Sequence, residues 1–164
     1  MKQAVEKVEQ VLKQEGYIWL APIASELLKR SYKTILEWVT GCMKIYISET
    51  KVDDLSKISN YIQQLLNLQI DSQNIFTSDL CKKISIEIWD SSGREEIQVA
   101  ISRLWWSIAA FKDGDDKRGI SEASMAVELL LSDNISNRQL LNRYLETALL
   151  VDEKYINQTV AKLE

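Results

Sequence analysis

Histidine is absent from this sequence, so the side chains left for acid–base or nucleophilic chemistry include those of Asp, Glu, Tyr, Lys and two cysteines. The chain holds 24 Asp and Glu residues, two cysteines and no histidine among its 164 residues. Without histidine, nucleophilic pairs of the Ser–His or Cys–His kind and Glu-x-x-His di-iron sites are excluded. The phosphate-binding motifs GxGxxG and GxxxxGK(S/T) are absent as well. Chemistry that uses only Asp, Glu, Tyr or Lys stays open, but we expect a protein that is not an enzyme and that binds no cofactor or metal ion.

The densest acidic cluster consists of Asp113, Asp115 and Asp116. Its spacing invites comparison with a calcium-binding EF-hand loop. The comparison fails, because Lys117 occupies the fifth ligand position and Arg118 the position that requires glycine. The simpler interpretation is a charged turn that ends one helix and begins the next. If the cluster has a function, it is a landing site for Lys or Arg side chains of a protein partner.

The most distinctive aromatic feature is the pair Trp105–Trp106. Neighbouring residues on a helix point about 100° apart, so both cannot belong to one buried stripe. If Leu104 and Ile108 mark the centre of that stripe, Trp105 lies on its shoulder and Trp106 points nearly the opposite way. Either the helix is packed on both sides, or it keeps Trp106 on a face for a partner. For the second case we predict a partner-binding site formed by Trp106 and the Asp113, Asp115 and Asp116 cluster.

Composition places the chain among folded proteins and narrows its partners. Hydrophobic residues make up 46% and charged residues 27% of the sequence, as in ordinary globular domains. A net charge of −4 argues against a nucleic-acid partner, which needs a basic surface, and is compatible with a basic protein partner. We found no signal segment and no apolar stretch long enough to cross a bilayer, so we expect a cytoplasmic protein without membrane contact. Cys42 and Cys81 lie in apolar surroundings, and we expect both to be buried.

Apolar residues recur every three or four positions through most of the chain, which predicts helices. Helix-breaking residues are scarce, with one proline and five glycines, as expected of a mostly helical chain. We predict a single all-α domain over residues 1–164, a multi-helix bundle of about seven helices with its core centred on helices at 22–48 and 94–112. Further helical patterns cover 2–15, a segment that begins after Asp53 or Asp54, about 73–89, about 118–132, a segment that ends at Leu150, and a short segment capped by Asp152.

Two local patterns complicate this prediction. Residues 43–48 and 84–89 also alternate as strands do, so a small two-stranded ribbon is the competing structure. We favour helices there, because an isolated ribbon is only marginally stable. Ser92 and Ser136 each stand three residues before Glu or Gln, which is the spacing of a capping box at the start of a helix.

The segments LWWSIAAF (104–111) and SEASMAVE (121–128) resemble the all-α immunity proteins of bacterial polymorphic-toxin systems. Those families carry a Trp-bearing helix followed by an Ala-rich helix. The resemblance implies a non-catalytic inhibitor that binds and neutralises a cognate protein toxin, and the partner could then be a basic toxin domain.

Two other binding functions are alternatives to an inhibitor. The first is a structural or assembly protein that acts through homo- or hetero-oligomerisation. The second is a helical domain that binds a small apolar ligand in a pocket near Trp38 and Trp105.

Overall fold

Helices form all the regular secondary structure in the computed structural model, which describes residues 1–91, 93, 95–131 and 138–162. These residues contain no strand, which confirms the predicted all-α fold. The eight helices in this part of the chain, close to the predicted number of about seven, are α1 (Lys2–Glu15), α2 (Ala21–Leu28), α3 (Tyr32–Glu49), α4 (Leu55–Gln69), α5 (Ser78–Asp90), α6 (Glu96–Lys112), α7 (Asp116–Leu129) and α8 (Arg138–Ala161).

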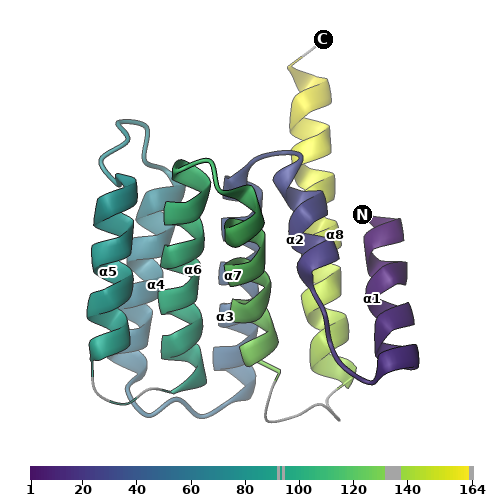
Figure 1. Ribbon diagram of the computed structural model, residues 1–164, viewed down its shortest axis with the longest axis horizontal. Helices are drawn as coiled ribbons and strands as arrows, with labels where there is room; N and C mark the ends of the chain where they lie inside the picture. Colours follow the sequence, from purple (N-terminus) through teal and green to yellow (C-terminus); the bar gives the residue numbers. More distant parts are fainter. Residues whose placement is uncertain (92, 94, 132–137, 163–164) are drawn as a thin grey trace.

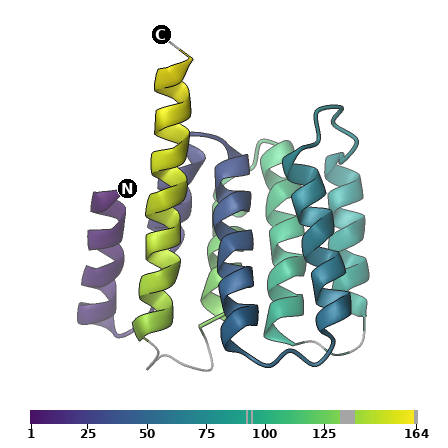
Figure 2. The ribbon, with the colours of Figure 1, turned by 180° about the vertical axis from the view of Figure 1, so that it is seen from behind.

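The helices stand side by side in two layers (Figures 1 and 2). Helices α2, α7, α6 and α5 form the layer nearer the viewer in Figure 1, α8, α3 and α4 lie behind them, and α1 lies at one end. Helix α3 packs on α2, α4, α6, α7 and α8, while α6 packs on α3, α4, α5 and α7. The core is therefore centred on α3 and α6, which correspond to the second part of the predicted segment 22–48 and to the segment 94–112.

The prediction of a single helix over 22–48 is wrong, because the helical conformation ends with α2 at Leu28 and resumes with α3 at Tyr32. Helix α3 starts afresh at Tyr32, where the Ser31 side chain accepts a hydrogen bond from the Lys33 N–H at 3.2 Å. Ser31 is thus an N-cap of the favoured type. The apolar stripe continues across this break because α2 and α3 both bury apolar residues in the same core, so periodicity alone could not reveal it.

The competing ribbon is also wrong, since 43–48 lies within α3 and 84–89 within α5. The strand-like alternation depended on counting Ser85 as a solvent-facing polar residue. Ser85 is instead buried against α6, where its hydroxyl donates to the Ser102 carbonyl at 2.8 Å. Ser85 is therefore polar because it bonds to a neighbouring helix, and its position in the sequence only resembled that of a solvent-facing strand residue.

Helix α8 is one continuous helix of 24 residues, so the predicted break at Asp152 is wrong. The Asp152 side chain is buried, and its Oδ1 lies 3.2 Å from Nε of Arg30. Its partner is 122 positions away in sequence, which no local pattern reveals. Ser92 and Ser136, expected in capping boxes, lie outside the described residues, and the N-cap of α6 is Glu95.

Replacing Arg30 by methionine should destabilise the fold, because it leaves the buried Asp152 carboxylate without its cation. Arg30 is itself 36% exposed, so solvent screens part of the effect and we expect a loss of about 1–2 kcal/mol in the free energy of unfolding. Chemical denaturation followed by circular dichroism measures this loss. The matched control is Lys83→Met, which removes an exposed pair with Glu87 and should change stability by less than about 0.5 kcal/mol. Equal losses in the two variants would contradict the role given to Arg30.

Cys42 and Cys81 are both buried and unbridged, as predicted. Burial raises the pKa of the Cys42 thiol well above its ordinary value and that of Cys81 to about 11. Because the thiolate is the reactive form, neither thiol should react with Ellman's reagent at pH 8 in the folded protein. Both should react once guanidinium unfolds the chain. Rapid labelling of the native protein would show that one of these side chains reaches solvent.

Candidate protein-binding surface

The two adjacent tryptophans lie in different environments. Trp105 is fully buried, and its ring centroid lies 5.6 Å from that of Phe76. Trp106 is only partly covered, on the side of α6 that faces the space between α5 and α7. The helix is therefore packed on several sides and still leaves part of Trp106 accessible, a combination of the two arrangements considered from the sequence.

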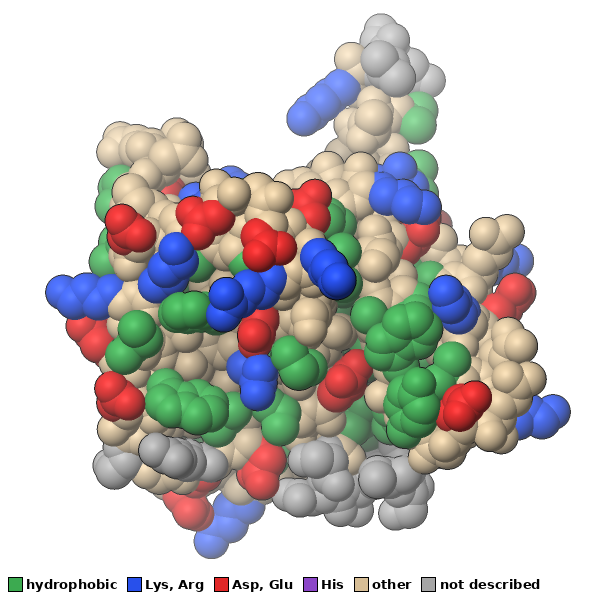
Figure 3. Space-filling view, in the orientation of Figure 1, with side chains coloured by type: hydrophobic (Ala, Val, Ile, Leu, Met, Phe, Trp, Pro, Cys, Tyr) green, Lys and Arg blue, Asp and Glu red, His purple; other side chains and the backbone are tan. Residues whose placement is uncertain are grey.

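Trp106 belongs to a groove of about 290 Å³ that lies over α6 between α5 and α7. Two of its apolar side chains are well exposed, Ile86 by 51% and Trp89 by 42%. Figure 3 shows hydrophobic side chains interspersed with charged ones on this face of the molecule. The residues that line the groove are Ser85, Ile86, Trp89, Ser102, Arg103, Trp106, Arg118 and Glu122.

Small residues bring the three helices together at the floor of the groove. The Ser85 and Ser102 hydroxyls each donate to the other residue's carbonyl, at 2.8 and 2.9 Å, and so join α5 to α6. On the other side, the Ser107 hydroxyl donates to the Gly119 carbonyl at 2.6 Å. A Cβ at Gly119 would lie 2.3 Å from the Phe111 ring, so a larger residue here would force the ring of Phe111 to move. The larger side chains of Ile86, Trp89 and Trp106 line the groove above these contacts.

The charged side chains of the groove are two arginines and one glutamate. Nη1 of Arg103 lies 2.8 Å from Oε2 of Glu122, while its buried Nε has no acceptor in the described part of the protein. The Arg118 guanidinium lies over Trp106, with 5.0 Å between its central carbon and the ring centroid. This is the geometry of a cation–π contact.

The predicted acidic cluster does not line the groove: Asp113 and Asp115 lie in the α6–α7 connection, and Asp116 is the first residue of α7. Oδ2 of Asp113 lies 2.7 Å from Nζ of Lys82, and the hydrogen bond from this lysine lowers the pKa of the Asp113 carboxyl. Asp115 caps α7 by accepting the Arg118 N–H at 3.1 Å. Asp116 is exposed in the first turn of α7. Two of the three carboxylates therefore have structural partners, as expected of a charged turn.

Sequence reasoning missed most of the groove. Ile86 and Trp89 share one face of α5, three residues apart, and this spacing was the only local signal for them. Arg103 and Glu122 gave none, because their pairing depends on how α6 and α7 pack. Of the predicted site residues, only Trp106 lies in the groove.

One buried carboxyl group, that of Glu128, has a structural hydrogen-bond partner. Burial raises the pKa of the Glu128 carboxyl, which is the kind of shift that a general acid requires. Its Oε1, however, accepts the Leu20 N–H at 2.8 Å and ties the segment before α2 to α7. Among the described residues, no group of three or more Cys, Asp and Glu side chains could hold a metal ion.

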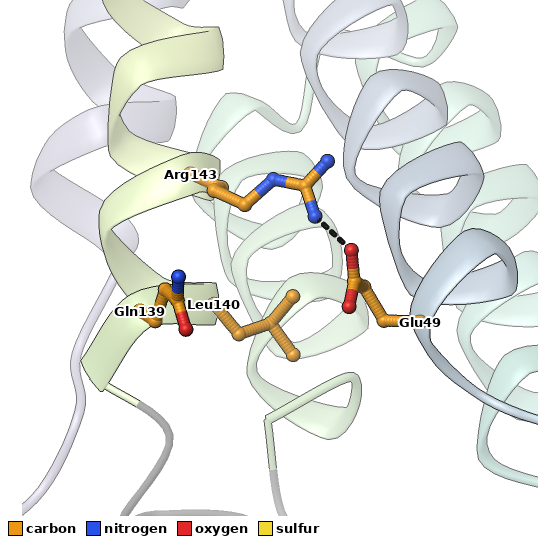
Figure 4. Close-up of a pocket in the computed structure, with 4 residues that line it drawn as sticks. All are labelled: Glu49, Gln139, Leu140 and Arg143. Carbon is orange, nitrogen blue, oxygen red and sulfur yellow. Dashed lines mark hydrogen bonds and ion pairs between the residues drawn. The ribbon is translucent and has the colours of Figure 1, made fainter.

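Other cavities in the described structure range from about 80 to about 690 Å³, and two of them are larger than the groove around Trp106. A cavity of about 80 Å³ lies between the end of α3 and the start of α8, where Glu49 pairs with Arg143 beside Gln139 and Leu140 (Figure 4). A wider groove of about 690 Å³ runs along α1, whose Glu9 pairs with Arg138 of α8. Trp38 and Trp105, where a ligand pocket had been considered, are both fully buried.

The chain was compared with family models, curated proteins and solved structures. No family model, curated protein or solved structure matches the chain. A bilayer-crossing helix is also not found, since none within the described ranges combines the required length and apolar character.

Proposed function

We propose that this chain is a non-catalytic protein-binding module and that the groove around Trp106 is its binding surface. The observation that carries the proposal is the row of partly exposed Ile86, Trp89 and Trp106 side chains beside Arg118. Tryptophan and arginine are enriched among the residues that dominate protein interfaces. They are carried here by helices held together by buried hydrogen bonds, so little ordering would be needed on binding.

We further propose that the module is an immunity-type inhibitor of a protein toxin. The segments that resemble such proteins, 104–111 and 121–128, belong to α6 and α7. These two helices supply most of the groove lining, including Trp106. An inhibitor of this kind would need only a rigid surface that covers the active site of its partner, and no chemistry of its own.

The test is co-expression with the product of the gene immediately upstream, scored by bacterial growth. The wild-type chain should restore growth, whereas Trp106→Ala should fail while remaining folded. Trp19→Ala is the matched control, because Trp19 is 36% exposed but lies in the link between α1 and α2, outside the groove. A neighbouring product that is neither toxic nor bound would overturn the immunity role. Full rescue by folded Trp106→Ala would overturn the assigned surface.

A second candidate, assembly through a second copy, is favoured by the end of α8. This end projects beyond the other helices (Figures 1 and 2), and its Ile156 and Val160 side chains are 39% and 52% exposed. Light scattering separates the two candidates. A monomer at micromolar concentration agrees with the inhibitor, whereas a dimer that Ile156→Glu dissociates would favour assembly.

A further inference from the structure

We infer that the groove around Trp106 accepts a partner segment that presents an apolar side chain next to a carboxylate. The inference rests on the proposed function and deepens it, because it names the chemistry of the segment that binds. Three features of the groove support it: its charge, its free hydrogen-bond donors and its exposed apolar wall.

The lining of the groove carries a net positive charge, although the chain as a whole is acidic. Arg103 and Arg118 face a single carboxylate, that of Glu122, whereas the net charge of the chain is −4. Glu122 is already paired with Arg103 at 2.8 Å. No carboxylate among the described residues forms an ion pair with Arg118. A partner carboxylate would supply the missing charge.

The arrangement of Arg118 suits a carboxylate better than a neutral acceptor. Its guanidinium lies over the Trp106 ring, and a guanidinium in a cation–π contact can still donate N–H hydrogen bonds to a second partner. Two parallel N–H donors match the two oxygens of a carboxylate.

The apolar wall requires more than a free carboxylate. Ile86 and Trp89 remain 51% and 42% exposed beside the half-buried Trp106, and burying them needs an apolar group from the partner. A volume of about 290 Å³ is at the small end of ligand pockets. It suits one or two side chains of a polypeptide that continues along the open groove.

The experiment is a selection of random displayed peptides on the full-length wild-type chain, with counter-selection on Trp106→Ala. The enriched peptides should carry Asp or Glu within a few positions of an aliphatic or aromatic residue. Their affinity should fall about fivefold at low salt in Arg118→Gln and less at high salt, where the charges are screened. Lys83→Gln, which removes an exposed cation outside the groove, should leave the affinity unchanged.

A double-mutant cycle measures the interaction between Arg118 and the peptide carboxylate. Once Arg118 is glutamine, replacing the peptide carboxylate by its amide should have no further effect. Peptides that need Trp106 but are neutral or basic, and that ignore Arg118→Gln, would overturn this inference and leave the proposed function standing. A selection that yields no Trp106-dependent peptide would count against both.

Discussion

Replacing Trp105 by alanine should lower the free energy of unfolding by about 3–5 kcal/mol, the range measured when large buried aromatic side chains are truncated. Trp105 is fully buried in the core and packs against Phe76. Its indole N–H has no acceptor in the described structure, so the loss comes from packing and from the cavity left behind. Guanidinium denaturation followed by circular dichroism measures the loss.

Trp106→Ala is the matched control, since it removes the same side chain one position along the same helix. Trp106 is only partly covered, and less apolar area leaves the protein interior when it is truncated. We therefore expect a loss below about 2 kcal/mol. If both alanine variants lose the same stability, Trp106 is a core residue and the groove is not a binding surface.

Truncating Trp106 should have the largest effect on binding. We expect Trp106→Ala to weaken the affinity for the protein partner by at least about 2 kcal/mol, or roughly thirtyfold, as for aromatic residues at the centre of an interface. Trp106→Phe keeps an aromatic face under Arg118 and should recover part of this loss. Isothermal titration calorimetry on both variants measures the difference. Wild-type affinity in a folded Trp106→Ala protein would place the interface elsewhere.

Asp116 gives the contrast for this measurement, because it is the member of the acidic cluster without the structural roles of Asp113 and Asp115. Asp116→Asn should reduce the affinity by less than about 1 kcal/mol, and added salt should shrink the effect further. An Asp116→Asn effect larger than that of Trp106→Ala would instead make the start of α7 the main contact.

Local patterns were sufficient to predict the class of the fold. The apolar periodicity that predicted 2–15 and 94–112 corresponds to α1 and α6, because each of these helices buries a continuous stripe. The same reasoning did not predict the break before Tyr32, because the apolar stripes of α2 and α3 are buried in the same core. Asp152 suggested a cap, but its partner is Arg30, far away in sequence. The pairing of Arg30 with Asp152 thus explains a residue whose role the local sequence pattern left ambiguous.

Only a fraction of the candidate site could be predicted from the sequence. Trp106 stood out because two adjacent tryptophans cannot share a buried face. The remainder of the groove depends on how closely the helices approach, which Ser85, Ser102 and Gly119 determine through contacts that no spacing rule encodes. The acidic cluster was conspicuous in the sequence, yet most of it serves the turn between α6 and α7.

The central claim, that the groove around Trp106 binds a protein, is tested most directly by the tryptophan indole signals in a ¹⁵N NMR titration. The chain has five tryptophans, and single Trp→Phe variants assign their signals. Adding the partner should shift the signals of Trp106 and Trp89, which line the groove. The buried Trp38 and Trp105 should move little, and so should Trp19 in the link before α2. A partner that binds while the Trp106 and Trp89 signals stay in place would contradict the claim.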